Sequence, residues 1–302
     1  MTLVPQTLTA RSAPNKGELA VDPVLRQIRD LVYKVSGIYK AEDKLYLLAD
    51  GCGRRMKQLS VRTPREYWNH LTVQPKRDGE LRQLLNEITI GETCLFRSPP
   101  QLDALRKVIL PEIVADASKQ ITRRLRIWSA GCSSGEESYT LAMSLLEESR
   151  RLLKDWTVEI LATDLNDRSL EAARAGVYGD YALRSTTDYF KRKYFSAVEQ
   201  NKLQVRPEVK KLITFSRLNL QDDSRMLFMK GVDLIFCCNV LIYFDGASKA
   251  KVINHFFSNL NSGGYLFLGT SESLMKLNDQ FHLVHFPGTI GYWKPSVKKA
   301  RT

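Results

Sequence analysis

The stretch from Arg126 to Tyr139 constrains the fold of this chain more than any other. Residues 126–130 form a short apolar run without breakers, which predicts a buried strand. The small residues that follow, up to Gly135, predict a tight loop, and the apolar spacing from Glu137 onward predicts a helix. A buried strand, a small-residue loop and a helix in this order are typical of the first unit of a nucleotide-type α/β sheet.

The acidic residues around this loop indicate what kind of ligand it binds. Small residues let a ligand approach backbone amides, but Glu136 and Glu137 at the positive end of the helix would repel a pyrophosphate. We therefore expect hydroxyl groups or a cation there. Asp164 ends a predicted strand that begins at Val158, where such folds hydrogen-bond a ribose. Together these acids favour an adenosine without phosphates, as in S-adenosylmethionine.

A simpler interpretation of the loop stays open at this point. Gly131 to Gly135 can be an ordinary tight turn, and Glu136 and Glu137 can serve only to offset the helix dipole. Asp164 makes the ligand-binding interpretation the stronger of the two.

The bulk composition is that of an ordinary soluble protein. With 302 residues, 43% of them hydrophobic and 26% charged, the chain can form one large core and a smaller domain. No apolar run approaches the roughly 20 residues of a membrane span, and residues 1–16 lack the apolar centre of a signal peptide, so we expect a cytoplasmic protein. The five cysteines include no C-x-x-C pair and no histidine cluster accompanies them, so we predict neither a disulfide nor a metal site.

The charge of the chain predicts an acidic partner. The formal net charge is +12 and the isoelectric point is about 9.4. We predict a disordered arm over residues 1–20 and a small helical domain over residues 21–90, where helical spacing continues without a strand signal. Within that domain, the segment 51–65 carries basic residues and no acid, which favours a docking surface over an ordinary solvated face. These basic residues are Arg54, Arg55, Lys57, Arg62 and Arg65.

The predicted α/β domain follows a loop. Residues 91–101 are expected to form this linker, in which Arg97 follows apolar Leu95 and Phe96. An arginine so close to buried side chains needs a carboxylate partner, which can belong to the protein or to a substrate. The α/β domain itself is expected over residues 102–302.

The later strands predict a parallel sheet with an antiparallel end. Residues 232–238 are almost continuously apolar, as a central parallel strand requires. Ligands of open α/β sheets bind beyond the carboxyl ends of strands, so Cys238, Asn239 and Tyr243 are expected to face the site. Residues 178–218 predict an inserted β-rich subdomain, and residues 282–293 predict a closing hairpin.

Two local features are also predicted. Asp167 is expected to cap a helix over residues 168–175. Gly263 and Gly264 are expected to form a turn before a strand at residues 265–269.

Five ordered motifs in the sequence resemble those of the CheR-type chemotaxis receptor methyltransferases. They are Gly91-Glu-Thr-Cys-Leu-Phe-Arg97, Trp128-Ser-Ala-Gly-Cys-Ser-Ser-Gly-Glu-Glu-Ser-Tyr139, Ala162-Thr-Asp164, Asn219-Leu220 and Cys238-Asn-Val-Leu-Ile-Tyr-Phe-Asp245. Members of that family transfer a methyl group from S-adenosylmethionine to glutamate side chains of methyl-accepting chemotaxis proteins. The resemblance implies a Rossmann-like seven-stranded methyltransferase sheet with an antiparallel final strand, a small all-helical N-terminal domain and an inserted β-subdomain.

The resemblance also implies roles for particular residues. It suggests that a basic N-terminal helix, here with Arg54, Arg55 and Lys57, docks on acidic receptor helices, and that the inserted subdomain is a second receptor contact. Family members commonly have Asn at the position of Gly91 and Arg at the position of Cys238. Losing the Asn amide should remove one cofactor hydrogen bond, worth about 1 kcal/mol. The implied cofactor contacts come from Thr93, Arg97, Glu137, Asp164, Asn219, Leu220, Cys238 and Asn239.

Methylation of a glutamate substrate requires little chemistry from the enzyme's side chains. The glutamate carboxylate is ionised at pH 7, so methylation of the oxygen needs no general base, and the enzyme must desolvate and align the anion. We expect Arg97 to pair with the substrate carboxylate and Tyr243 to orient it. We expect a monomer that binds the cytoplasmic helical domain of receptors, without metal, nucleic acid or membrane insertion.

Two other classes of function compete with this interpretation. The charge of +12 would suit a nucleic-acid methyltransferase, but Asn239-Val-Leu-Ile-Tyr243 lacks the Asn/Asp-Pro-Pro-aromatic motif of many enzymes that methylate base nitrogens. Gly91 and Cys238 would suit an adaptor that binds S-adenosylmethionine without turnover. The presence of Arg97 and Tyr243 argues against the adaptor.

Overall fold

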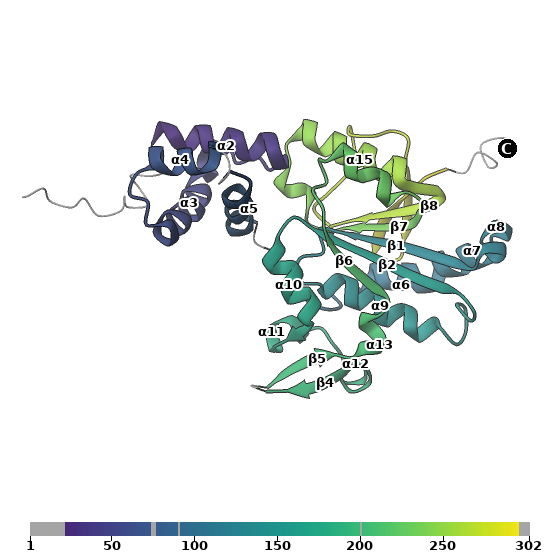
Figure 1. Cartoon of the computed structure of the whole chain (residues 1–302). Helices are drawn as coiled ribbons and strands as arrows, with labels where there is room; N and C mark the ends of the chain where they lie inside the picture. Colours follow the sequence, from purple (N-terminus) through teal and green to yellow (C-terminus); the bar gives the residue numbers. More distant parts are fainter. Residues whose placement is uncertain (1–21, 74–76, 90, 200, 296–302) are drawn as a thin grey trace, which may run out of the picture. The chain divides into compact units, whose positions relative to one another are not determined.

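The chain consists of two compact units, Met1–Ile90 and Gly91–Thr302. The structure, a computed structural model, describes residues 22–73, 77–89, 91–199 and 201–295 (Figure 1). The arm expected over residues 1–20 lies outside the described residues.

The described part of the first unit is helical, which confirms the expected all-helical domain. Its helices are α2 (Pro23–Ser36), the 3₁₀ turn η1 (Glu42–Lys44), α3 (Leu45–Leu59), α4 (Pro64–Thr72) and α5 (Arg77–Ile88). Their buried faces carry apolar residues at helical spacing, for example Leu25, Ile28 and Val32 in α2.

The ends of these helices follow from local sequence signals. Helix α2 begins where the Asp22 carboxylate accepts a 2.7 Å hydrogen bond from Val24 N, and Pro23 occupies the first helical turn. It ends at Gly37, whose left-handed backbone (φ 73°) suits glycine. Thr63 and Glu66 form a reciprocal capping box at the start of α4.

The second unit is built on a seven-stranded sheet. The strand order is β6 (Ile213–Arg217), β2 (Thr157–Asp164), β1 (Arg124–Ala130), β7 (Val232–Cys237), β8 (Leu260–Leu268), β10 (Thr289–Trp293) and β9 (His282–Phe286). The first five strands are parallel, and β10 is antiparallel to both β8 and β9. This arrangement confirms the predicted α/β fold with its antiparallel closing strand.

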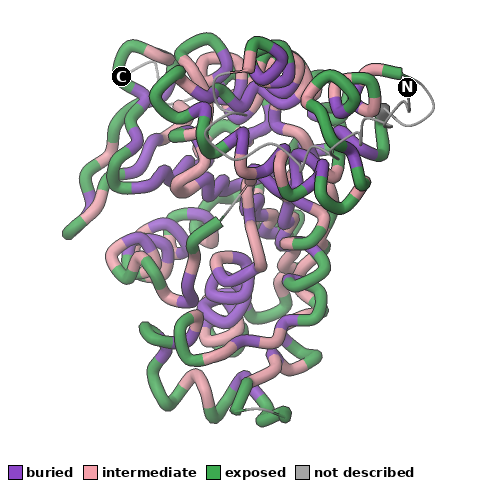
Figure 2. The backbone as a smooth tube through the Cα atoms, turned by 90° about the vertical axis from the view of Figure 1, so that its left-hand side faces the viewer, coloured by how far each residue is buried: buried purple, intermediate pink, exposed green. Residues whose placement is uncertain are grey.

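Helices cover both faces of this sheet, because successive strand residues point to opposite sides. Ile127 belongs to a core with α9 (Glu136–Glu148), whereas Trp128 packs on the other side against Phe256 of α15 (Gly246–Asn259). Figure 2 shows exposed stretches both at turns and along the outer sides of helices, with buried stretches between them. The remaining helices outside the insertion are α6 (Pro99–Ala104), η2 (Leu105–Ile109), α7 (Leu110–Ala115), α8 (Ala117–Thr122), α10 (Asp167–Ala175), α14 (Asp223–Met226), η3 (Leu227–Met229) and η4 (Leu241–Tyr243).

The inserted subdomain differs from its expected bounds. It contains a small antiparallel sheet, and this sheet starts at Val177, one residue earlier than predicted. Strand β6, which falls inside the predicted bounds 178–218, does not belong to the insertion, because it pairs with β2 at the edge of the main sheet. The elements of the insertion are β3 (Val177–Tyr178), α11 (Asp180–Leu183), α12 (Asp188–Tyr194), β4 (Phe195–Val198), β5 (Lys202–Val205) and α13 (Pro207–Lys210).

Three local predictions were wrong. The cap of α10 is Asn166, whose side chain accepts from Ser169 N, and Asp167 is the first residue of the helix. Gly263 and Gly264 lie inside β8, where a Cβ on Gly264 would come within 2.7 Å of the Asp233 carbonyl oxygen. The loop expected over residues 91–101 ends earlier, since α6 begins at Pro99.

The described residues contain no helix long and apolar enough to cross a membrane. They also contain no group of three or more His, Cys, Asp or Glu side chains that could hold a metal ion. All five cysteines carry free thiols.

Candidate active site

The glycine loop after β1 is held between the two neighbouring strands. Gly131 N and Cys132 N both donate to the Thr163 carbonyl, at 2.8 and 2.9 Å, which fixes the loop to the end of β2. On its other side, a Cβ on Gly131 would lie 2.4 Å from the side chain of Val240, which follows β7. Gly131 also has φ +78°, so only glycine fits there without strain.

The Asp164 carboxylate at the end of β2 faces this loop. Its Oδ2 accepts from Ser133 N and its Oδ1 accepts from Asn166 N, each at 2.8 Å. Burial raises the pKa of Asp164, and these backbone hydrogen bonds act in the opposite direction. Each carboxylate oxygen has two acceptor sites, so the group can still accept a ligand hydroxyl.

The two acids at the start of α9 have different surroundings. Glu136 is buried and accepts from the Ser134 hydroxyl at 2.8 Å, so its bonds stay within its own turn. Glu137 accepts from the Ser129 hydroxyl at 2.7 Å and from the Cys238 thiol. Burial raises the pKa of Glu137, while these two bonds lower it. Glu137 thus lies at the carboxyl ends of β1 and β7, where a ligand would bind.

Tyr243 lies among charged groups from several loops. Its pKa is raised first by burial and then by the negative charge of Asp164, whereas the positive charge of Arg97 lowers it. Arg97 also lowers the pKa of Glu137. Arg97 and Asp164 therefore lie near enough to Tyr243, and Arg97 near enough to Glu137, for their charges to act on these groups.

The loop that carries Arg97 is anchored on both sides. Leu95 N donates to the Ala182 carbonyl at 2.9 Å, and Phe96 N donates to the Thr140 hydroxyl at 2.9 Å. The Phe96 ring packs 4.5 Å from that of Phe190, and its backbone has φ 56°, a strained value for a bulky residue. Arg97 itself is exposed and donates from Nη1 to the Glu92 carbonyl at 2.8 Å. The anchored neighbours hold an arginine whose other donors can reach a ligand.

The chain after β7 contributes two of the predicted cofactor contacts, Cys238 and Asn239. Cys238 lies 3.6 Å from Gln101 Oε1 in addition to its contact with Glu137. Burial and the Glu137 charge raise the pKa of the Cys238 thiol well above its usual value, so it stays protonated and can donate. Asn239 has φ 62°, and its N–H donates to the Glu272 carboxylate at 2.7 Å.

The remaining predicted cofactor residues lie around the same edge of the sheet. Leu218 N donates to the Asp164 carbonyl at 3.0 Å, so Asn219 and Leu220 continue beside the end of β2. The Leu220 carbonyl contacts His255 Nδ1 at 2.9 Å. Thr93 is partly buried in the loop before Arg97.

Comparisons with known proteins assign this arrangement to a family. Residues 91–290 match the description "CheR methyltransferase, SAM binding domain", and residues 23–89 match "CheR methyltransferase, all-alpha domain". The chain belongs to the CheR methyltransferase family.

Curated relatives cover most of the chain. Chemotaxis protein methyltransferase 2 of Vibrio cholerae is 32% identical over 91% of this chain and 93% of its own length. The chemotaxis protein methyltransferase of Borreliella burgdorferi is 36% identical over 83% of this chain and 88% of its own. That of Vibrio parahaemolyticus is 41% identical over 71% of this chain and 77% of its own. The family assignment makes S-adenosylmethionine the expected ligand of the site.

Sequence reasoning missed three residues that shape this CheR-family site. Ser129 donates to Glu137, Gln101 contacts Cys238, and Glu272 binds the Asn239 amide. Only Glu272 had a usable signal, since it follows a predicted strand by a few residues, as Asp164 does. The other two act through contacts that local sequence does not reveal.

The structure corrects the interpretation of the basic segment in the helical unit. Arg55 is buried, with its Nε and Nη2 donating to the Glu80 carboxylate at 2.9 and 2.6 Å, and Tyr67 donates to the same carboxylate at 2.8 Å. The carboxylates absent from segment 51–65 are thus supplied by α5. Because its guanidinium is engaged and covered, Arg55 cannot meet a receptor as predicted.

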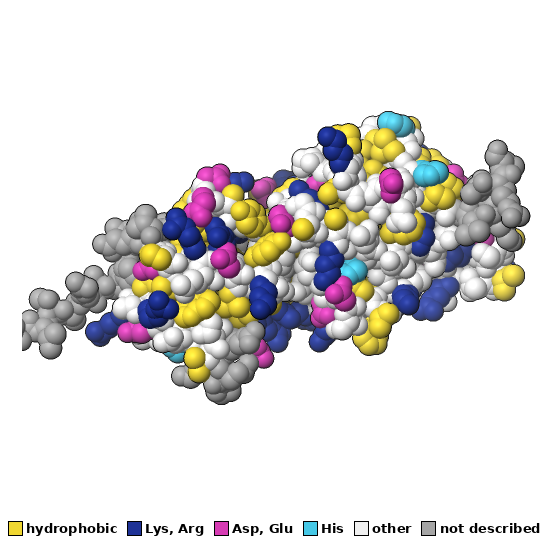
Figure 3. Space-filling view, turned by 90° about the horizontal axis from the view of Figure 1, so that it is seen from above, with side chains coloured by type: hydrophobic (Ala, Val, Ile, Leu, Met, Phe, Trp, Pro, Cys, Tyr) yellow, Lys and Arg dark blue, Asp and Glu magenta, His cyan; other side chains and the backbone are white. Residues whose placement is uncertain are grey.

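The other two predicted docking residues differ from Arg55. Arg54 pairs with Glu87 at 2.6 Å, but its side chain keeps 46% of its area exposed. Lys57 is exposed. On the face seen in Figure 3, Lys and Arg are interspersed with Asp and Glu instead of forming one positive patch. A docking role therefore stays a prediction for Arg54 and Lys57 only.

Proposed function

We propose that this CheR-family chain transfers the methyl group of S-adenosylmethionine to glutamate carboxylates of methyl-accepting chemotaxis receptors and forms glutamate methyl esters. The observation that carries the proposal is that the carboxylates of Glu137 and Asp164 are held at the carboxyl edge of the sheet, with Arg97 and Tyr243 near enough for their charges and those of the acids to interact. A cation beside a phenol hydroxyl can hold an anionic substrate, and two acids beyond it can hold a cationic cofactor.

The residues present fit S-adenosylmethionine. The Asp164 carboxylate is fixed by two backbone amides and suits the ribose hydroxyls, and the half-buried Glu137 suits the positive charge of the cofactor. Gly131 lets the loop pack directly against Val240, since a Cβ there would lie 2.4 Å from the Val240 side chain. Thr93, Asn219, Leu220, Cys238 and Asn239 are proposed to complete the contacts. When bound, S-adenosylmethionine supplies an electrophilic methyl group and leaves as S-adenosylhomocysteine.

The protein residues then have to position an anion. A glutamate is ionised near pH 7, so no group needs to remove a proton from it. Arg97 binds this carboxylate from the anchored loop, and Tyr243 donates its hydroxyl to the same group. The raised pKa of Tyr243 keeps that hydroxyl protonated, which preserves it as a donor. Alignment and removal of water thus account for the proposed catalysis.

The partner follows from the substrate. We infer that the cytoplasmic helical domain of receptors is bound by a monomer in the cytoplasm, without nucleic acid, metal or membrane insertion. Arg54 and Lys57 remain available for docking, and the inserted subdomain is the proposed second contact. The family assignment does not favour a nucleic-acid methyltransferase. It equally disfavours a non-catalytic adaptor.

The proposal is tested by mapping the modified atoms. A receptor cytoplasmic fragment is incubated with S-adenosylmethionine and the wild-type enzyme, Arg97→Ala or Arg97→Lys, and its peptides are sequenced by mass spectrometry. We expect added methyl groups on glutamates only, and a turnover loss in Arg97→Ala that exceeds its loss of cofactor affinity, with partial recovery in Arg97→Lys. Methyl groups on other residues would reject the substrate assignment. Equal losses of turnover and cofactor affinity would make Arg97 a cofactor ligand only.

A further inference from the structure

Glu272 makes an unusual set of hydrogen bonds beside the proposed site. Its Oε2 accepts from Asn239 N at 2.7 Å and from Gly269 N at 2.8 Å, and its Oε1 accepts from Ile242 N at 3.2 Å. The residue is buried, with 8% of its surface exposed. One carboxylate therefore joins the chain after β7 to the chain after β8.

The backbone amides of the chain after β7 need a hydrogen-bond acceptor such as Glu272. Asn239 has left-handed backbone (φ 62°) and thus leaves the strand, and residues 241–243 form only a single 3₁₀ turn. The amides of Asn239 and Ile242 point to Glu272 instead of to a strand or helix carbonyl. A buried amide without a partner is unfavourable, so this carboxylate strongly favours one conformation of the segment.

Gly269 shows independently that the contact is close. A Cβ at this position would lie 2.8 Å from both Asn239 N and Glu272 Oε2. No side chain fits there unless the Asn239–Glu272 hydrogen bond moves. The two chain segments are therefore packed backbone to backbone around the carboxylate.

We propose that Glu272 is a positioning residue that holds the 239–243 segment, and with it Asn239 and Tyr243, in the conformation needed for methyl transfer. This inference rests on the proposed function for the roles of those two residues. Glu272 touches neither substrate nor cofactor in this proposal. It acts by fixing the backbone from which the two side chains extend.

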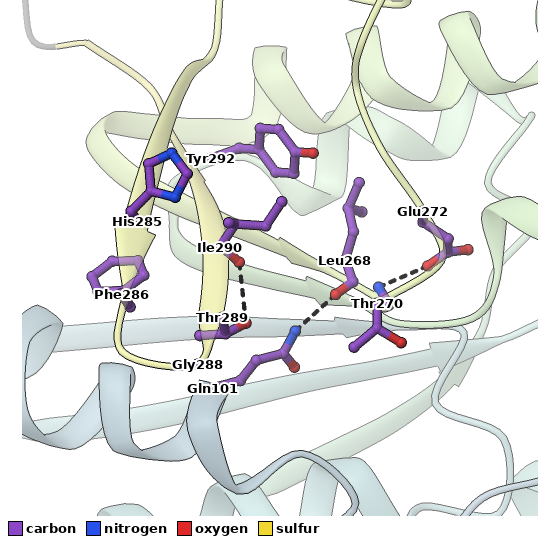
Figure 4. A pocket seen from close by; sticks show the side chains of 11 residues that line it. Gln101, Leu268, Thr270, Glu272, His285, Phe286, Gly288, Thr289, Ile290 and Tyr292 are labelled. Carbon is purple, nitrogen blue, oxygen red and sulfur yellow. Dashed lines mark hydrogen bonds between the residues drawn. The ribbon is translucent and has the colours of Figure 1, made fainter.

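The pocket beside Glu272 should allow a variant without this carboxylate to fold, so the proposal can be tested. Glu272 lines a pocket of about 400 Å³ together with Gln101, Thr270 and His285 (Figure 4). Water from this pocket can reach the loop amides when the carboxylate is removed. Glu272→Ala should therefore fold while losing the fixed loop conformation.

The experiment compares Glu272→Ala, Glu272→Gln and Gly269→Ala with the wild-type enzyme. It measures kcat and KM for a receptor fragment and the dissociation constant of S-adenosylhomocysteine. We expect kcat of Glu272→Ala and Gly269→Ala to fall by about 10²-fold, the loss typical of a misplaced catalytic group, while KM changes much less. Glu272→Gln keeps the oxygen that two amides share, so it should recover part of the rate.

A matched control separates positioning from stability. Glu148 is as buried as Glu272 and pairs with Arg106 and Arg151 at the last turn of α9, away from the glycine loop. Glu148→Ala should lower the melting temperature yet leave kcat per folded molecule within about twofold of wild type. A similarly small change in kcat for Glu272→Ala would overturn the proposal.

Hydrogen exchange distinguishes this inference from the proposed function. In Glu272→Ala, the amides of Asn239, Ile242 and Gly269 should exchange faster than in the wild type, whatever the substrate. Unchanged exchange at all three amides would overturn the inference even if the enzyme is active. An inactive wild-type enzyme with faster exchange in the variant would instead reject the proposed substrate and leave the positioning of the segment established.

Discussion

At the scale of single residues, the proposed choice of ligand depends on two half-buried carboxylates. Burial raises the pKa of both Asp164 and Glu137. Hydrogen bonds from neighbouring groups lower both pKa values part of the way back. When ionised, both groups act only as hydrogen-bond acceptors and carry the negative charge that would face a cation. The site thus holds negative charge that a bound cation would stabilise.

The raised pKa values predict how cofactor affinity depends on pH. A carboxyl group with a raised pKa takes up its proton at a higher pH than a free carboxyl, so affinity should be full near neutral pH and be lost as pH falls through the raised values. Titration calorimetry with S-adenosylhomocysteine at decreasing pH checks this. Asp164→Asn should bind more weakly and depend less on pH. Wild-type affinity that persists until ordinary carboxyl groups titrate would contradict this prediction.

Gly91 is a second residue whose effect can be isolated. A Cβ there would lie 2.3 Å from Ser133 Oγ and 2.9 Å from Ser133 Cβ, so Gly91→Asn alone should displace the glycine loop and weaken binding of S-adenosylhomocysteine. Ser133 has φ 49°, a conformation that glycine adopts readily.

Ser133→Gly should therefore relieve the collision and restore affinity in the double variant, with a coupling of about 1 kcal/mol in a double-mutant cycle. Ser133→Gly alone is the control. Additive effects of the two changes would mean that the two residues do not interact.

At the scale of elements, the helical unit depends on an ion pair between α3 and α5. The Glu80 carboxylate accepts from Arg55 and from the fully buried Tyr67. Removing Arg55 leaves a buried negative charge, so Arg55→Ala should lower the free energy of unfolding by about 3–5 kcal/mol. Lys57→Ala, on the exposed side of the same helix, should change it by less than about 0.5 kcal/mol. Urea denaturation measures the free energy of unfolding of both variants. Similarly small losses of that free energy in the two variants would contradict the structural role of Arg55.

The same element shows where local sequence stops being informative. The run of basic residues in segment 51–65 is visible in the sequence, but its partners Glu80 and Glu87 belong to another helix. The pairing depends on how α3 and α5 pack, and helical periodicity alone does not fix that packing. A basic segment without local acids was therefore misread as entirely free for a partner.

At the scale of the whole molecule, the sequence predicted the central strands of the sheet better than its edge strand and the contacts between its loops. Apolar runs identified β1, β2 and β7, because buried parallel strands are apolar on both faces. The predicted bounds of the insertion included the strand Ile213–Arg217. A short strand of mixed burial has the same sequence pattern in a small or a large sheet, and only its pairing with β2 assigns it to the main sheet. Glu272 was missed for a related reason, because its hydrogen bonds join segments that are distant in the sequence.

The division into two units gives a prediction of its own. Every proposed cofactor contact, from Thr93 to Asn239, lies in the unit Gly91–Thr302. A fragment of residues 91–302 should therefore bind S-adenosylhomocysteine with a dissociation constant within about threefold of the full chain, as independent folding of a domain with its own core allows. Calorimetry on the fragment and the full chain makes the comparison. Loss of binding by a folded fragment would show that the helical unit contributes to the cofactor site.

We propose that the product is a carboxyl methyl ester on a receptor, and the behaviour of the transferred methyl group in base distinguishes this ester from other products. Radiolabelled methyl groups from S-adenosylmethionine are transferred to a receptor cytoplasmic fragment, which is then treated with base. We expect label to enter the fragment and to leave it as volatile methanol. Label that stays on the fragment after base, or no label although calorimetry shows cofactor binding, would contradict it.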